Sequence, residues 1–259
     1  MPLDINRVYQ MDCIDMLYSL DDNMIDLAVL DPPYNMHKAD WDTFKSNNLF
    51  LEFTYKWIDA LLPKIKDDGS LYIFNTPLNS SFILQHLLEK GMYFRNWITW
   101  DKRDGFSGGT RKYANTQETI LFLTKSNKYV FNYDAIRVPY DSTKRIKAAA
   151  KKGILKDGKR WFPNPKGKLC GEVWHIVSER HKNKINGKVQ KQLHKTPKPV
   201  EMIERIIKAS SMPGDLVFDC FVGTGTTAFV AKKLKRNFLC SDISQEYVNL
   251  TLERLEIMK

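Results

Sequence analysis

The sequence feature that most constrains the fold lies near the C-terminal end, where a strand, a glycine turn and a helix follow one another. The apolar run 216–221 predicts a buried strand, residues 222–227 read Val-Gly-Thr-Gly-Thr-Thr, and residues 228–234 predict a helix. Glycine lets the backbone approach a ligand closely, and a helix N-terminus favours a polar or anionic group. A second strand, 237–241, ends at Asp242, 17 positions after Gly225, about where a βαβ nucleotide site places its ribose-binding carboxylate. Although the turn lacks a third glycine, the combination of strand, glycine turn, helix, strand and acid predicts an adenosine-containing ligand. Because a Walker A lysine is absent, hydrolysis of a nucleoside triphosphate is disfavoured. A tight βα turn that binds no ligand is the alternative.

Strands and helices alternate along most of the 259-residue chain, which is long enough for one large domain or a core with an insertion. We expect strands at 7–11, 25–30, 70–74, 93–100 and 118–124, and helices at 15–20, 49–65, 79–90, 197–209 and 244–256. Asn79 is expected to cap its helix, and Gly91 to end it. The alternation predicts an α/β fold with a doubly wound, mostly parallel sheet, in which ligands bind at the carboxyl ends of the strands.

A short polar corner follows the predicted strand 25–30. Asp31-Pro32-Pro33-Tyr34 combines an acid, two prolines and an aromatic ring. Proline has no N–H and a fixed φ, so the corner is stiff and rich in acceptors, and the ring can stack on a planar base. Such a corner suits a base with an exocyclic amine, whose two hydrogens a carboxylate oxygen and a main-chain carbonyl can accept. An ordinary strand-ending turn is the alternative.

Basic residues are concentrated in one part of the chain. Residues 142–195 hold sixteen Lys or Arg against three acids, so this segment carries +13 and the rest of the chain −3 (10 − 13). A basic segment on a mildly acidic body predicts a surface for a polyanion, with a solvated lysine-rich surface as the alternative. Nucleic acid is favoured over membrane, because no amphipathic basic helix stands out and no apolar stretch reaches the roughly 20 residues that span a bilayer.

The sequence shows no pattern typical of a metal site or of a disulfide framework. Its four cysteines are scattered without zinc-site spacing, and no carboxylate cluster suggests a metal or a nuclease centre, so no metal site is expected. We interpret the cysteines as small buried hydrophobes in a reducing cytosol. No signal peptide is apparent at the N-terminus.

Together these motifs resemble the S-adenosylmethionine-dependent DNA amino-methyltransferases. The order of corner, basic segment and glycine turn is similar to the β-class arrangement, a permuted Rossmann-like methyltransferase sheet, and the likeness covers nearly the whole chain. Its markers are residues 31–34, 69–77, 118–119, 196–199 and 221–226, and the stretches 96–105 and 158–165 are similar to MboII-type adenine methyltransferases. Many relatives have Ser where Thr224 stands, a hydroxyl-for-hydroxyl change.

The resemblance implies S-adenosylmethionine as cofactor and a role for each matching residue. Asp31 and the Pro32 carbonyl would accept the amine hydrogens of a flipped base, beside Pro33, while Tyr34 stacks on it, and the methyl group would move in line without a covalent enzyme intermediate. The methionine part of the cofactor would lie on Asp219, Phe221, Gly223, Gly225 and Thr226, with its carboxylate near Thr196, Lys198 and Pro199. Its ribose would contact Asp242 with Ser244 behind, and its adenine would contact Asp12 and Cys13. Asp31 would also border the cofactor, and helix capping is the alternative for Asp12.

The resemblance also implies double-stranded DNA as the partner. A target-recognition insertion of residues 125–195 would interrupt a catalytic core made of 1–124 and 196–259. The candidate DNA contacts are Arg103, Arg111, Lys112, Lys159, Arg160, Arg180 and Lys182.

The target base is expected to be adenine, because in this family an aspartate opens the tetrapeptide more often for adenine and a serine more often for cytosine. Cytosine N4, an RNA base, a protein glutamine amide and a non-catalytic DNA-binding module are the alternatives. The expected setting is a restriction–modification system in the bacterial cytoplasm. A homodimer and a cognate endonuclease acting on the same site are partners that the sequence leaves open.

Overall fold

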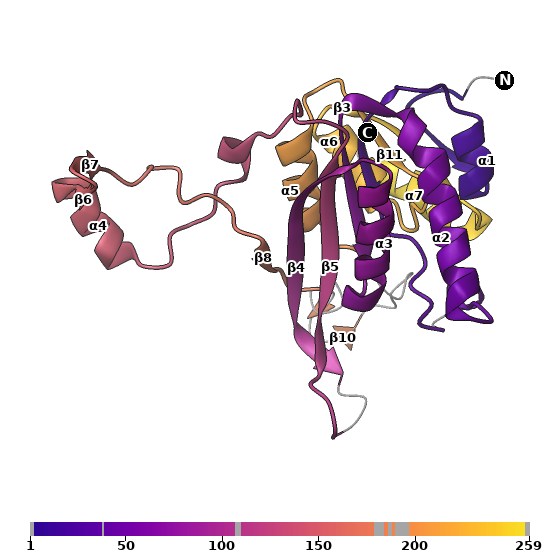
Figure 1. Cartoon of the computed structure of the whole chain (residues 1–259), viewed down its shortest axis with the longest axis horizontal. Helices are drawn as coiled ribbons and strands as arrows, with labels where there is room; N and C mark the ends of the chain where they lie inside the picture. The colour runs from indigo at the N-terminus through magenta and orange to yellow at the C-terminus, as the bar shows by residue number, and fades with distance from the viewer. Residues whose placement is uncertain are drawn as a thin grey trace.

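The computed structural model describes residues 3–37, 39–106, 110–178, 184–185, 188–189 and 197–256, without the side chains of 103–106, 184–185 and 188–189. Its described part contains an eight-stranded sheet in the order β1-β12-β11-β2-β3-β5-β4-β8 (Figure 1). The strands are β1 (Arg7–Gln10), β2 (Ile25–Leu30), β3 (Ile65–Asn75), β4 (Tyr93–Phe106), β5 (Asn115–Thr124), β8 (Val173–His175), β11 (Leu216–Asp219) and β12 (Asn237–Asp242). Neighbouring strands run parallel except at β5, which pairs antiparallel with β3 and β4. The predicted mostly parallel α/β sheet is confirmed.

Helices cover both faces of the sheet, as the doubly wound prediction requires. One face packs on α1 (Cys13–Tyr18), α2 (Asn47–Leu61) and α3 (Pro77–Glu89), and the other on α5 (Val200–Ser210), α6 (Thr226–Lys233) and α7 (Gln245–Glu256). Successive residues of β2 divide between the two cores, since Ala28 and Leu30 pack with Leu17 and Trp57, whereas Leu27 and Val29 pack on the opposite face. A strand buried on both sides reads as a continuous apolar run, which is why β2 has the bounds that the sequence predicts.

Most predicted helix boundaries differ from the observed ones by a few residues, and proline explains two of the differences. The helix expected at 49–65 ends at Leu61, where the 3-10 turn η2 (Leu62–Lys64) contains Pro63, and β3 begins at Ile65. The cap of α3 is Thr76 and not Asn79, because Pro77 occupies the first helical turn and the Thr76 hydroxyl accepts from the Asn79 N–H. Gly91 ends this helix as predicted, with φ +84°.

The chain between β5 and α5, which includes the basic segment, forms several short elements. It contains η3 (Tyr133–Ile136), the helix α4 (Thr143–Lys152), the hairpin β6 (Ile154–Lys156) with β7 (Lys159–Trp161), and the strand pair β9 (Lys184–Ile185) and β10 (Lys188–Val189). Figure 1 shows α4 and the hairpin projecting from the body of the molecule. The strand β8, from the same part of the chain, pairs with β4 in the central sheet. The boundaries at 125 and 195 therefore stay a proposal.

The expectation that no amphipathic basic helix is present is wrong, because α4 is one. Lys144, Lys147 and Lys151 share one face at helical spacing, while Ala149 is buried on the other. Among the described helices, none is long and apolar enough to cross a bilayer.

Candidate active site

A cavity of about 290 Å³ lies at the carboxyl ends of β1, β2, β11 and β12. Each strand contributes a predicted site residue there, because the ends of parallel strands meet at one edge of the sheet. The predicted residues that line the cavity are Asp12, Cys13, Asp31, Pro32, Pro33, Tyr34, Lys198, Phe221, Gly223, Asp242 and Ser244. The corner after β2 and the glycine turn after β11 therefore share one cavity.

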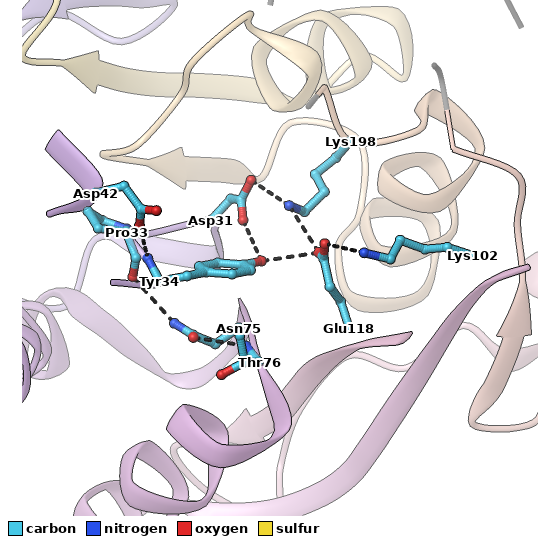
Figure 2. Close-up of polar contacts among 9 residues, drawn as sticks. All are labelled: Asp31, Pro33, Tyr34, Asp42, Asn75, Thr76, Lys102, Glu118 and Lys198. Carbon is cyan, nitrogen blue, oxygen red and sulfur yellow. Dashed lines mark hydrogen bonds and ion pairs between the residues drawn. The ribbon is translucent and has the colours of Figure 1, made fainter. Parts of the chain in front are cut away.

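Side chains from a loop, a helix and the end of β3 hold the backbone of the corner, and Figure 2 draws two of them, Asp42 and Asn75. Asp42, in the 3-10 turn η1 (Asp40–Asp42), is 2% exposed and accepts the Tyr34 N–H at 2.6 Å and the Met36 N–H at 3.0 Å. The Asn79 amide of α3 donates to the Tyr34 carbonyl at 2.8 Å, and the Asn75 amide at the end of β3 reaches the Pro33 carbonyl at 3.5 Å. None of these bonds uses the Pro32 carbonyl.

A charged cluster surrounds the Asp31 carboxylate. Its Oδ1 accepts the Tyr34 hydroxyl at 2.8 Å, and its Oδ2 accepts the Lys198 ammonium at 2.7 Å. Glu118 of β5 joins the cluster, since its Oε2 lies 3.3 Å from both the Tyr34 hydroxyl and Lys198 Nζ. Lys102 of β4 donates to the other Glu118 oxygen at 3.0 Å. Figure 2 shows these side chains converging on one another from separate parts of the chain.

Burial and charge fix the protonation of two members of the cluster. Burial, together with the Asp31 and Glu118 carboxylates, raises the pKa of Tyr34 well above its usual value, so the phenol keeps its proton and donates it. Burial alone would lower the pKa of Lys198, but the same two carboxylates outweigh it and raise that pKa. Lys198 is therefore a cation at neutral pH, and its ammonium lies 5.2 Å from the Phe74 ring centre and 5.4 Å from that of Tyr34.

Asp242 organises the glycine turn from the neighbouring strand. Its Oδ2 accepts the Gly223 N–H at 3.0 Å and its Oδ1 the Ser244 N–H at 2.9 Å, while burial raises its pKa. Gly225 precedes α6 with φ +75°, and a Cβ there would lie 2.5 Å from Cγ2 of Thr251. Only glycine fits this close approach without strain.

Four predicted cofactor residues of the described chain lie outside the cavity lining: Pro199, Asp219, Gly225 and Thr226. Asp219 accepts the Phe221 N–H at 3.0 Å, and burial, the largest cause, raises its pKa to about 7. Pro199 caps α5, and the Thr226 hydroxyl accepts from Arg254 at 2.9 Å. Thr196 lies outside the described residues.

The helix-capping interpretation of Asp12 is confirmed, and its contact with the cofactor adenine stays a prediction. It caps α1 by accepting the Ile14 N–H at 2.8 Å, and it also lines the cavity. Its neighbour Cys13 is buried, which raises the pKa of the thiol to about 12. Cys13 therefore contributes a small apolar wall and not a nucleophile.

Several cavity residues carry no predicted role. Glu118 belongs to the charged cluster, where it pairs with Lys102 from outside the cavity lining, and Asp42 holds the corner. The remaining wall is apolar or aromatic and comprises Trp41, Phe44, Phe53, Cys220, Ile243 and Tyr247. An acid opening the apolar strand 118–124 was a usable signal for Glu118, whereas the aromatic residues lie in no recognisable motif.

The candidate DNA contacts differ in their surroundings. Arg111 and Lys112, before β5, and Lys159, on the hairpin, are exposed. Arg160 is also exposed but donates to the Lys152 carbonyl, so it holds the hairpin on α4. The side chain of Arg103 and the whole of Arg180 and Lys182 lie outside the described structure.

Comparison with known proteins finds a family and a near relative. A family model described as DNA methylase matches residues 25–253. The type II methyltransferase M1.MboII of Moraxella bovis is 61% identical over 258 residues, which cover 98% of this chain and 99% of that protein.

Two solved structures are similar along the whole chain. One is a complex of M1.HpyAVI with SAM, with a TM-score of 0.63, 24% identity, and coverage of 96% of this chain and 99% of that one. The other is the PvuII DNA methyltransferase, described as cytosine-N4-specific, with a TM-score of 0.70, 16% identity, and coverage of 98% and 87%. At these identities the likeness shows the fold.

Proposed function

Because this chain belongs to the N6/N4 DNA methylase family, we propose that it methylates the N6 amine of adenine at a specific sequence in double-stranded DNA. It is an S-adenosylmethionine-dependent DNA methyltransferase of the restriction–modification type. The observation that carries the proposal is the shared cavity, in which the Asp31 corner and the glycine turn meet.

The residues of the cavity fit S-adenosylmethionine. Gly223 lets the cofactor lie close to the backbone of the turn, Asp242 offers acceptors for ribose hydroxyls, and Trp41 and Ile243 offer walls for an adenine ring. When bound, S-adenosylmethionine supplies a methyl group that its sulfonium has already activated for transfer.

The chain's own work is to place and polarise the acceptor nitrogen. The target base has to leave the duplex, because its amine cannot be reached inside the stack. Asp31 and the Pro32 carbonyl then accept the two amine hydrogens, which directs the nitrogen lone pair at the methyl group, while the Tyr34 ring supports the base. Such positioning can lower a barrier by roughly 7–11 kcal/mol.

Adenine is preferred over cytosine because the corner opens with Asp31. A structure described as a cytosine-N4-specific methyltransferase has a similar fold, so the fold suits either the adenine N6 or the cytosine N4 amine. The preference for adenine therefore depends on the corner itself. An N4-cytosine acceptor is the second candidate. The bacterial cytoplasm, a homodimer and a cognate endonuclease that cuts the same sequence complete the proposal.

The segment between β5 and α5 is proposed to bind the DNA target. The basic face of α4 and the exposed Lys159 point to the phosphate backbone as its ligand, and Trp161, 51% exposed, adds an aromatic surface beside them.

The test is incorporation of labelled methyl groups into DNA by the wild type and by Asp31→Ala. We expect the variant to lose roughly 10²–10³-fold in rate, the effect of removing one preorganised polar partner. It should still fold, because Lys198 keeps Glu118 as its counter-ion. Asp21→Ala, an exposed aspartate before β2, is the matched control. Near-normal incorporation by Asp31→Ala would remove this residue from the mechanism.

A further inference from the structure

Glu118 is a largely enclosed acid in the charged cluster, and the proposed mechanism gives it no role. Its side chain is 13% exposed, and both of its oxygens are occupied by cations or a hydroxyl. Lys102 holds Oε1 at 3.0 Å, while Oε2 faces Lys198 and the Tyr34 hydroxyl at 3.3 Å each. A single bridging group, either the Tyr34 hydroxyl or the Lys198 ammonium, therefore connects Glu118 to the Asp31 carboxylate.

Lys198 lies between the two carboxylates but nearer to the one that the reaction needs. Its ammonium is 2.7 Å from Asp31 and 3.3 Å from Glu118. The side chain is only 10% exposed and lies among the rings of Phe74, Tyr34 and Trp100. A buried ammonium needs a carboxylate partner, so Lys198 cannot release Asp31 without another acceptor nearby. Glu118 is that acceptor.

We propose that Glu118 is a positioning residue that takes over the Lys198 ammonium when Asp31 binds the amine of the target base. The inference rests on the proposed function and extends it to a residue that does not touch the base. The change required is small, because the Glu118 contact already exists and only has to shorten as the Asp31 contact lengthens.

Charge supports the same role. Asp31 and Glu118 carry two formal negative charges, and Lys102 and Lys198 carry two positive charges, so the cluster is formally neutral. The acceptor nitrogen becomes positive as it gains the methyl group, and it loses a proton afterwards. Without the Glu118 charge the cluster would be formally positive beside that nitrogen, and Lys198 would stay on Asp31.

The test compares single-turnover methyl transfer in Glu118→Gln, Glu118→Asp and the wild type. Glutamine keeps the shape but not the charge, and we expect a transfer rate roughly 100-fold lower, the loss that a misplaced reacting group produces. Aspartate keeps the charge one methylene farther from Lys198, and its rate should fall between the other two. S-adenosylmethionine affinity should stay at the wild-type value in both variants. Glu89→Gln, on the exposed end of α3, is the matched control.

Wild-type transfer by Glu118→Gln would overturn the inference. So would equal rates in the two variants, or a loss of cofactor affinity of similar size in both, because either result assigns Glu118 a purely structural role. If glutamine prevents folding, aspartate alone decides, since slower transfer at unchanged affinity supports the inference and an unchanged rate overturns it. Absence of DNA methylation by the wild type would refute the proposed function instead, so the two failures are distinguishable.

Discussion

Alanine at Gly225 should destabilise the protein more than alanine at Gly91. Both glycines have positive φ, +75° and +84°, so both substitutions force an L-residue into the left-handed region, at about 1–2 kcal/mol. They differ in space, because a Cβ at Gly225 would meet Thr251 Cγ2 at 2.5 Å, whereas at Gly91 it would meet nothing within 4 Å. Overpacking adds about 1–3 kcal/mol at Gly225 alone.

The free energy of unfolding, measured in urea, should therefore fall by about 2–5 kcal/mol in Gly225→Ala and by about 1–2 kcal/mol in Gly91→Ala. The difference between the two variants corresponds to about 2–12 °C in Tm. Gly91 is a strict control, since it shares the backbone conformation and lies outside the cavity.

Gly225→Ala should also weaken cofactor binding. The Thr251 hydroxyl donates to the Gly223 carbonyl at 2.9 Å, so a side chain that displaces Thr251 also disturbs the turn that faces the cavity. Titration with S-adenosylmethionine should show lower affinity for Gly225→Ala and unchanged affinity for Gly91→Ala. Equal losses of stability in the two variants would refute the argument that α7 packs closely against the turn.

Three further outcomes follow from the structure. Asp42→Ala leaves the Tyr34 and Met36 N–H groups without their carboxylate, so unfolding in urea should show a loss of about 1–3 kcal/mol, and an unchanged midpoint would contradict the role of this acid. The pKa of Asp219 is about 7 in the folded state against an ordinary 3.8, so the folded state binds more protons and wild-type stability should fall as pH rises between these values. Asp219→Asn should flatten that fall in Tm, and a Tm that falls with pH as steeply in the variant as in the wild type would contradict the raised pKa. Glutamine at the α4 lysines should reduce the slope of log K for DNA binding against log salt concentration by about 0.9 for each phosphate that is no longer neutralised. Glutamine at Lys56 on α2 should leave the slope unchanged, and a wild-type slope in the α4 variants would mean that α4 is only a solvated face.

Local patterns were enough to predict a mostly parallel sheet and the two turns that line the cavity. The run Ile25–Leu30 has its predicted bounds because it is buried on both faces, and the glycine turn has its predicted place because positive φ limits the residues that fit. Both signals are contained in a few consecutive residues.

The parts of the site that escaped prediction depend on long-range contacts. Tyr34 and Glu118 are 84 positions apart, and Asp31 and Lys198 are 167 apart, so no local pattern joins them. Asp42 escaped for another reason, because an acid in a polar loop gives no sign that it is buried. The basic helix α4 escaped because alanine and Ile146 provide only a narrow apolar face.

The central claim is that the Asp31 corner presents an adenine amine to the methyl donor. Mass spectrometry of the nucleosides from DNA treated with this protein and S-adenosylmethionine tests it most directly. The account predicts N6-methyladenine from the wild type and, after the same reaction time, roughly 10²–10³-fold less from Asp31→Ala. N4-methylcytosine as the product, or equal N6-methyladenine from both proteins, would contradict it.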